Sequence, residues 1–387
     1  MRPKIDFLYF NAGGGHRAAA TALEAMLRQQ DRPWQVRLVN LNDVLMPTDV
    51  LKKVCGLGLE DIYNLMLKKG WTLGSAQLVP VMHFLIRLFH KRQVELIGGF
   101  WKQDTPDLVV SVIPNFNRAI LEGLRRCSAQ TPMVTILTDL ADYPPHFWLE
   151  RQSQYVICGS PKAVEQARAV GLPPGCIYQT SGMILRPHFY DVPPVDRASE
   201  RIRLGLSPDL PTGLVLFGGQ GAGVMLDITR RLSSCGRPMQ LILMCGQNKD
   251  LADKLRQLKT DMPMHVEGFT TEVPYFMQLA DFFIGKPGPG SISEAIAMHL
   301  PVIVECNAWT LPQERYNAEW IRGLNVGIVL KSFRTVDKAV TELIHSGDQS
   351  GDQLEKFRQA AAQIRNRAIF EIPDLLDEIL KRGNSLS

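Results

Sequence analysis

Short apolar runs alternate with helical patterns along most of this chain, and the alternation occurs in two separate halves. Such runs, rich in Val, Ile, Leu and Phe, are typical of the buried strands of parallel α/β proteins. They cover residues 5–10, 36–41, 108–113, 133–138 and 155–158, and then 213–217, 240–244, 265–266, 282–284, 302–304 and 327–330. Each half therefore predicts its own doubly wound parallel sheet, and the fold class is α/β.

A proline-rich stretch separates the two halves. Residues 187–209 contain four prolines and predict a linker with a short helix. We therefore expect an N-terminal domain over residues 1–186 and a C-terminal domain over residues 210–366. Residues 367–387 follow the second domain, and most of them read as an amphipathic helix. A chain of 387 residues suits two domains of this size.

Composition excludes several classes of protein. The net charge of +4 is too small to suggest a nucleic-acid partner by itself. The seven cysteines are scattered and never spaced as CxxC, which argues against a disulfide framework or a zinc site and for a reducing compartment. No signal peptide is visible, and the longest apolar run is shorter than the roughly 20 residues of a spanning helix. We expect a cytoplasmic protein that can still touch a membrane surface.

One segment, residues 47–102, interrupts the α/β rhythm of the first half. Between residues 50 and 103, eight Lys or Arg stand against three Asp or Glu, with aromatic residues among them. Basic and aromatic residues together favour an anionic membrane surface, while the alternative is a pair of core helices with solvated lysines. The candidate membrane residues are Trp71, Phe84, Arg87, Lys91, Arg92 and Trp101.

A first glycine-rich turn, NAGGGH at residues 11–16, precedes an alanine-rich helical pattern at residues 17–30. It does not match the dinucleotide fingerprint, because the GxGxxG spacing fails. His16 falls in the first helical turn, where the helix dipole disfavours the imidazolium form. This pattern predicts a neutral base, and the alternative is a histidine that only caps the loop.

Two further glycine-rich turns follow strands in the second half. GGQGAG at residues 218–223 is consistent with a diphosphate cradle or with a simple tight turn. GKPGPGSISE at residues 285–294 leads into a helical pattern over residues 292–298 and combines a lysine, close-approach glycines and a helix N-terminus. This combination predicts a phosphate site, and Glu294 is placed to bind ribose hydroxyls. The alternative is a capping box of Ser291 and Glu294, although two Pro-Gly pairs are costly for a plain cap.

A last polar motif, NAWTLPQERYN, occupies residues 307–317 after a strand. Its Gln313 and Glu314 suit the hydroxyls of a sugar, because an amide and a carboxylate stand side by side at the edge where α/β sheets bind ligands. The alternative is a solvated start of a helix.

Taken together, these motifs resemble the glycosyltransferase family that contains monogalactosyldiacylglycerol synthases, processive diacylglycerol glucosyltransferases and, more remotely, the peptidoglycan lipid-intermediate N-acetylglucosaminyltransferase. The resemblance covers nearly the whole chain. The matching motifs are AGGGH at 12–16, TDLADYPPHFW at 138–148, GMILRP at 182–187, GGQG at 218–221, EGF at 267–269, KPGPGSISEA at 286–295 and PQERYN at 312–317.

This resemblance implies a GT-B fold, with two Rossmann-like domains facing a cleft and no metal or other cofactor required. It assigns the N-terminal domain to the acceptor and membrane and the C-terminal domain to a UDP-sugar, and the last helix is expected to cross back to the N-terminal domain. His16 and, less directly, Asp139 are the implied catalytic residues. The implied acceptor residues are Gly14, Gly15 and Asn115. The implied donor residues are Gly219, Gln220, Gly221, Phe269, Thr270, Lys286, Gly288, Gly290, Ser291, Glu294, Gln313 and Glu314.

We therefore expect an inverting hexosyltransferase that moves a sugar from a UDP-sugar to a lipid hydroxyl, in diacylglycerol-type glycolipid synthesis at the inner face of a membrane. Tyr316 stands where relatives of this kind tend to have glycine, so the identity of the donor sugar does not carry over. The alternatives are a UDP-sugar epimerase on the same fold and an inactive relative that binds membranes.

Overall fold

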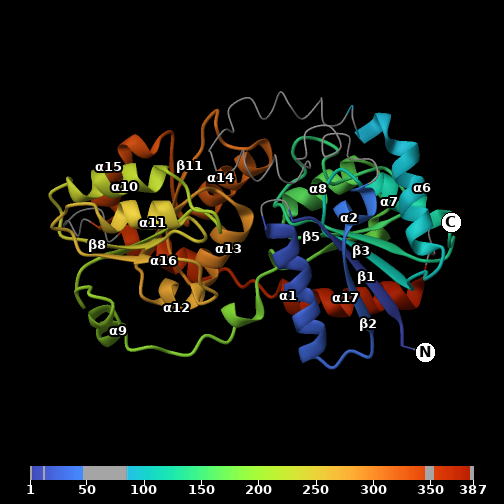
Figure 1. Cartoon of the computed structure of the whole chain (residues 1–387), viewed down its shortest axis with the longest axis horizontal. Helices are drawn as coiled ribbons and strands as arrows, with labels where there is room; N and C mark the ends of the chain where they lie inside the picture. Colours follow the sequence, from blue (N-terminus) through green and yellow to red (C-terminus); the bar gives the residue numbers. More distant parts are fainter. Residues whose placement is uncertain (1, 12–13, 47–83, 85, 345–352, 384–387) are drawn as a thin grey trace. The chain divides into compact units, whose positions relative to one another are not determined.

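The computed structural model describes residues 2–11, 14–46, 84, 86–344 and 353–383 of the chain. These residues form two compact units (Figure 1). Unit 1 comprises the described residues up to Pro187 together with those from Asn366 onward, and unit 2 comprises the described residues from His188 to Arg365. The chain thus passes from one unit to the other directly before His188 and returns directly before Asn366.

Unit 1 is built on a sheet of six parallel strands in the order β2-β1-β3-β4-β5-β6. The strands are β1 (Lys4–Tyr9), β2 (Gln35–Asn40), β3 (Leu108–Ser111), β4 (Met133–Ile136), β5 (Tyr155–Cys158) and β6 (Ile177–Gln179). The first five confirm the predicted runs. β6 was not predicted, because this three-residue edge strand is only partly buried and lacks a continuous apolar run.

Helices cover both faces of this sheet. They are α1 (Gly15–Gln29), α2 (Leu41–Leu45), α6 (His90–Trp101), α7 (Asn117–Arg125), α8 (Pro161–Ala169) and α17 (Ala368–Arg382). A buried cluster joins α2, α6 and α7 to β1 and β3 on one face, and α1 and α17 lie together on the other (Figure 1). The layers are those of a doubly wound domain.

The last helix, α17, is tied to unit 1 by polar contacts as well as by its buried apolar stripe. Arg32 pairs with Asp374, and the hydroxyl of Tyr178 donates to Oε1 of Glu378 at 3.3 Å. The backbone N–H of Ser181 donates to Oε2 of Glu371 at 2.8 Å. The final segment of the chain therefore completes the unit in which the chain began.

Unit 2 has a second sheet of six parallel strands, in the order β12-β11-β10-β7-β8-β9. The strands are β7 (Thr212–Leu216), β8 (Gln240–Met244), β9 (Met264–Glu267), β10 (Phe282–Gly285), β11 (Val302–Glu305) and β12 (Gly327–Leu330). The helices are α9 (Arg197–Arg203), α10 (Val224–Ser233), α11 (Lys249–Arg256), α12 (Val273–Gln278), α13 (Pro289–Ala297), α14 (Pro312–Leu324), α15 (Val336–Ile344) and α16 (Gln353–Ala362). Two doubly wound parallel sheets confirm the predicted fold class.

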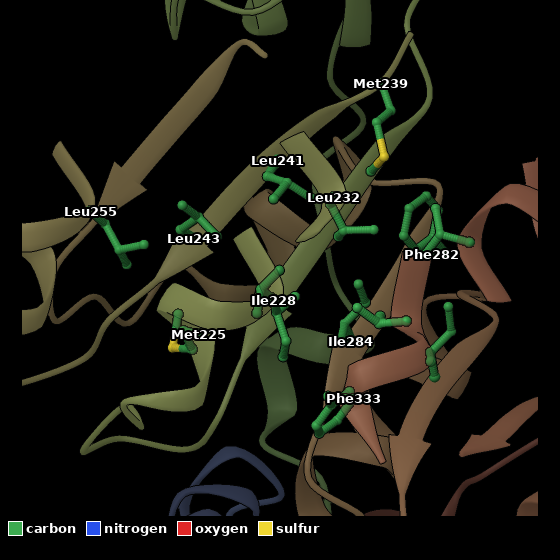
Figure 2. Close-up of a cluster of buried hydrophobic side chains, with 14 of the residues drawn as sticks. Met225, Ile228, Leu232, Met239, Leu241, Leu243, Leu255, Phe282, Ile284 and Phe333 are labelled. Carbon is green, nitrogen blue, oxygen red and sulfur yellow. The ribbon is translucent and has the colours of Figure 1, made fainter. Parts of the chain in front are cut away.

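The core of unit 2 fixes the turn that precedes α10. Met225, Ile228 and Leu232 of α10 are fully buried and recur at helical spacing, as Figure 2 shows. They pack against side chains of β8 and β10 such as Leu243 and Ile284. Because α10 is held on the sheet in this way, the glycine turn between β7 and α10 has a defined position.

Each sheet has one point where its winding reverses. In unit 1 this switch point lies between β1 and β3, and in unit 2 it lies between β7 and β10. Ligands of open parallel sheets bind beyond the carboxyl ends of the strands at such a point, because the two loops there leave in opposite directions. The predicted glycine-rich turns after β1, β7 and β10 all lie at these two places.

Candidate active site

His16 lies at the switch point of unit 1, as the second residue of α1. Its Nδ1 is 2.8 Å from the backbone oxygen of Val112, just after β3, and 3.1 Å from Oγ1 of Thr138, just after β4. A carbonyl oxygen can only accept a hydrogen bond, so we assign the proton to Nδ1. Nε2 then keeps its lone pair, which is what a general base needs.

The surroundings of His16 keep its imidazole neutral. Burial lowers the pKa of His16 from 6.5 to about 4, and the hydrogen bond to Val112 opposes this shift. The side chain is therefore uncharged near pH 7, as the sequence predicted. The main physical cause is lost hydration, whereas the sequence had pointed to the helix dipole.

Asp139 is connected to His16 through Trp148. The indole Nε1 of Trp148 donates to Oδ2 of Asp139 at 2.9 Å, and the centroids of the Trp148 and His16 rings are 5.9 Å apart. Asp139 is 7% exposed and Trp148 is fully buried. The structure thus brings the two predicted catalytic residues to one place, with an indole between them.

The three predicted acceptor residues lie at the same end of the sheet, Gly14 and Gly15 at the start of α1 and Asn115 in the loop after β3. Gly14 has a left-handed φ of 80°, and a Cβ added at Gly14 or Gly15 would meet no atom within 4 Å. Asn115 is also left-handed, and its N–H donates to the backbone oxygen of Phe147 at 2.6 Å. This bond ties the loop after β3 to the loop that carries Trp148. Acceptor binding by these residues stays a prediction.

In unit 2, backbone hydrogen bonds and a close backbone contact hold the turn after β7, and its tip is exposed. The N–H of Gly221 donates to the oxygen of Gly218 at 3.2 Å, and the oxygen of Gly219 accepts from the N–H of Gln247 at 2.9 Å. Gly221 has a φ of 59°, and a Cβ there would lie 2.7 Å from the Cys245 oxygen, so only glycine fits. Gly219 and Gln220 form the exposed tip.

The turn after β10 leads into α13, which begins at Pro289 with Gly288 as its N-cap. The predicted start at residue 292 was wrong, because the Pro-Gly pairs read as a loop although proline is favoured in the first position of a helix. Ser291 is the third residue of the helix and not its cap, and its Oγ donates to the Gly288 oxygen at 3.3 Å. The alternative interpretation of Ser291 and Glu294 as a capping box is therefore excluded.

The residues near the start of α13 meet the start of α14. Nζ of Lys286 is 2.8 Å from Oε1 of Glu314, whose residue is 7% exposed. A Cβ added at Gly288 would lie 3.3 Å from Cε of Lys286 and 3.6 Å from Oε1 of Glu314. Glu314 is thus buried and paired, which excludes the reading of Glu314 as part of a solvated helix start.

The remaining predicted donor residues also belong to unit 2. Phe269 follows β9, and its side chain is 65% exposed. Oγ1 of Thr270 accepts from the N–H of Glu272 at 3.0 Å. Glu294, in the second turn of α13, and Gln313, the second residue of α14, are half-buried, whereas Gly290 is exposed. Their roles in binding the donor stay predictions.

Residues 214–372 match the glycosyltransferase family 28 C-terminal domain. Over 407 aligned residues the chain is 30% identical to monogalactosyldiacylglycerol synthase 1, chloroplastic, of Arabidopsis thaliana, and the alignment covers 100% of this chain and 73% of that protein. The chain belongs to the monogalactosyldiacylglycerol synthase family. It is a glycosyltransferase, as the motifs predicted.

Two solved structures are similar to this glycosyltransferase in fold. MurG from Acinetobacter baumannii superposes with a TM-score of 0.59 at 13% identity, over 98% of this chain and 100% of that chain. HepE from Anabaena, in complex with UDP-glucose, gives a TM-score of 0.54 at 17% identity, over 98% and 99%. These similarities confirm the GT-B class of fold.

The predicted membrane residues of this glycosyltransferase divide into three groups. Trp71 lies outside the described residues. Phe84 is 64% exposed, and Arg87, Lys91 and Arg92 are exposed as well. Trp101 was wrongly predicted as a membrane contact, because its side chain is fully buried.

The burial of Trp101 has a specific cause. Its indole Nε1 donates to Oδ2 of Asp6 at 2.8 Å, and Asp6 lies in β1 with no exposed surface. Arg37 also donates from Nε to Oδ1 of Asp6, at 2.8 Å. A buried carboxylate in a strand needs such donors, so the tryptophan serves the core of unit 1.

Three residues of the site had no predicted role. Thr138 and Trp148 begin and end the motif TDLADYPPHFW, whose only assigned residue was Asp139. Asn317 ends PQERYN, is fully buried and donates from Nδ2 to the oxygen of Pro287 at 2.7 Å, which holds the turn after β10. The motifs contained these residues, but no pattern in them shows which loop each side chain reaches.

Within the part of the chain that the structure describes, no three His, Cys, Asp or Glu side chains are grouped as a metal site. In the same residues, no helix is both long and apolar enough to cross a lipid bilayer.

Proposed function

We propose that this glycosyltransferase moves a hexose from a UDP-hexose to the hydroxyl of a diacylglycerol-type lipid, with inversion at the anomeric carbon. The observation that carries the proposal is the state of His16, a neutral imidazole whose Nδ1 is engaged and whose Nε2 remains a base. Nε2 takes the proton of the acceptor hydroxyl as its oxygen attacks the anomeric carbon. The bond from that carbon to UDP breaks, and UDP leaves with the electron pair.

Asp139 stabilises the protonated form of the base in this reaction. Its carboxylate is buried next to the imidazole, with Trp148 between them. A negative charge near an imidazole favours the imidazolium that forms when His16 takes the proton. Asp139 therefore stabilises the charged base, and His16 moves the proton.

The donor is assigned to unit 2. Lys286, the exposed tip at Gly219 and Gln220, and the N-terminus of α13 supply positive charge and N–H groups for a diphosphate. Phe269 offers an exposed ring to the uracil, and Glu294 a carboxylate to the ribose. Because these groups can neutralise the leaving diphosphate, we propose that neither a metal nor another cofactor takes part.

The ion pair of Lys286 and Glu314 favours a donor that carries a sugar. A diphosphate drawn to Lys286 would leave Glu314 as a buried carboxylate without this cation. Sugar hydroxyls donated to Glu314, and to Gln313 beside it, would replace the lost partner. This supports a donor that carries a diphosphate and a hydroxyl-rich sugar in one molecule.

The lipid side of the proposal rests on the segment just before and within α6. Phe84 and Leu88 are 64% and 62% exposed, and exposed basic residues follow at Arg87, Lys91 and Arg92. Apolar side chains enter the interface while basic ones attract anionic lipid, at about 1 kcal/mol each. We propose peripheral association with the inner face of a membrane through this surface.

A vesicle-flotation assay tests the membrane surface. Replacing Arg87, Lys91 and Arg92 by Ala should weaken binding to anionic vesicles by about a hundredfold and should leave binding to neutral vesicles unchanged. A matched variant replaces three exposed basic residues of unit 2, namely Arg230, Arg237 and Lys254. Equal losses in both variants, or binding that salt does not affect, would remove the membrane claim.

The transfer itself is tested by incubating the protein with a panel of UDP-hexoses and vesicles that contain diacylglycerol, with lipid products followed by mass spectrometry. We expect a hexosyl lipid with one UDP-hexose, and equal yield with EDTA. If the UDP-hexose is converted to an isomer with no lipid product, the protein is an epimerase. If neither product forms with any donor, the transfer proposal is wrong.

A further inference from the structure

Asp142 is a buried carboxylate three residues after Asp139, and the proposed reaction gives it no role. We propose that Asp142 is a positioning residue, which fixes the loop of residues 142–148 so that Trp148 lies between His16 and Asp139. The proposal rests on the assignment of His16 as the base of the proposed transfer.

The side chain of Asp142 closes the loop on itself. Oδ2 accepts from the backbone N–H of His146 at 3.0 Å, and Oδ1 accepts from the backbone N–H of Trp148 at 2.6 Å. The residue is 2% exposed. One carboxylate therefore binds the loop four and six residues further along the chain, with one oxygen for each N–H.

The backbone of Asp142 is held from a different element. Its N–H donates to Oε1 of Gln166 at 2.8 Å, and its oxygen accepts from Nε2 of Gln166 at 3.0 Å. Gln166 lies in α8, which packs on the sheet. Asp142 thus connects α8, through its own backbone and side chain, to the end of the loop that carries Trp148.

That end of the loop carries the contacts to the reaction site. Besides its contacts to Asp139 and His16, Trp148 accepts at its backbone oxygen from Nδ2 of Asn117, at 3.2 Å. The neighbouring Phe147 oxygen accepts from the N–H of Asn115. If the loop shifts, the indole leaves His16 and Asp139 together.

The carboxylate is more than a convenient acceptor. Burial raises the pKa of Asp142, while the N–H groups of Trp148, His146 and Leu149 lower it. Burying a charge costs free energy unless it is bonded, and a neutral amide would place an NH₂ group against at least one of these backbone donors. Among short side chains, only a carboxylate accepts hydrogen bonds at both of its terminal atoms. This explains why an aspartate stands at this position beside the reaction site.

The test is Asp142→Asn, with the titration of His16 followed by NMR. A loosened indole would let water reach the imidazole, so the pKa of His16 should rise from about 4 by at least one unit. The turnover number should fall by about tenfold to a hundredfold, and the affinity for UDP should not change, because UDP is assigned to unit 2.

Trp101→Phe is the matched control, since it breaks the same kind of indole–carboxylate bond elsewhere in unit 1. It should lower Tm without moving the pKa of His16. If Asp142→Asn does not fold, Gln166→Ala removes the bonds to the Asp142 backbone and should give a smaller shift in the same direction.

Two results would overturn the proposal: a folded Asp142→Asn protein with the wild-type pKa of His16 and wild-type turnover, or an equal pKa shift in Trp101→Phe. Failure of the transfer mechanism is separate, because it shows as full turnover in His16→Ala. The NMR titration of His16 would still report whether Asp142 positions the indole.

Discussion

The two switch points have the same topology, but the residues in their loops differ in chemistry. In unit 1, the loops beyond β1, β3 and β4 bring together polar groups that are buried or half-buried, among them His16, Thr138 and Asp139. In unit 2, the loops beyond β7 and β10 bring together glycines and the charged Lys286. The sheet decides where a site lies, and the loop residues decide what the site can do.

The difference has a physical reason. A base must be kept neutral at working pH, and burial does this for His16 by lowering its pKa. A diphosphate instead needs close approach of backbone N–H groups and a point charge, which glycine turns and a lysine supply. We infer that unit 1 performs the proton transfer and unit 2 holds the donor.

The largest expected effect concerns His16. His16→Ala should reduce transfer by about a hundredfold to ten-thousandfold, because a positioned general base contributes that much. The measurement is the initial rate of glycolipid formation. His90→Ala is the matched control, since His90 pairs with Glu122 on the surface of the same unit and should keep its rate. Near-normal turnover in His16→Ala would remove the base assignment and, with it, the contrast between the units.

The next effect concerns Glu294. Glu294→Ala should weaken UDP binding about tenfold to a hundredfold, because a carboxylate that accepts from ribose hydroxyls is lost. The measurement is isothermal titration calorimetry with UDP. Glu319→Ala changes an exposed carboxylate in the same unit and should bind UDP normally. Equal affinities in the two variants would show that Glu294 is not part of the donor site.

A third prediction separates the two tryptophan–aspartate bonds of unit 1. Trp101→Phe should lower the free energy of unfolding by about 2 kcal/mol, because the buried Asp6 loses a donor, yet the rate per folded molecule should not change. Urea unfolding and the transfer assay measure both quantities. Trp34→Phe, at a partly exposed position, should cost less than about 1 kcal/mol. A lower transfer rate per folded molecule in Trp101→Phe would show that Trp101 acts in the reaction site and not only in the core.

A further effect is a change of stability with pH. The fold lowers the pKa of His16 from 6.5 to about 4, so the unfolded chain binds a proton more readily between these values. The contribution of His16 to stability is complete above pH 6.5 and is lost as the pH falls through about 4. His16→Gln should therefore flatten the dependence of the unfolding free energy on pH in this range, as measured in urea. An unchanged slope would mean that His16 is not desolvated in the fold.

The sequence predicted most of the fold because buried parallel strands are continuous apolar runs, and such runs are local. It missed β6, which is short and half-exposed, and it placed the start of α13 too late. Trp101 was misread because an aromatic residue among lysines looks like a membrane anchor, and its partner Asp6 is 95 residues away in the sequence.

The site was predicted less completely than the fold. The motifs named His16 and Lys286, because glycine turns and helix starts have a local signature. They could not show that Val112 and Thr138 engage Nδ1 of His16, since these contacts exist only once β1, β3 and β4 lie side by side. Contacts between residues far apart in the sequence produce no local pattern from which they could be predicted.

The most direct test of the division between the units is a calorimetric titration of UDP into His16→Ala and wild-type protein under the same conditions. If unit 1 holds the base and unit 2 holds the donor, the two proteins bind UDP with the same Kd. A Kd at least tenfold weaker in a folded His16→Ala protein would contradict this account, because His16 would then belong to the donor site.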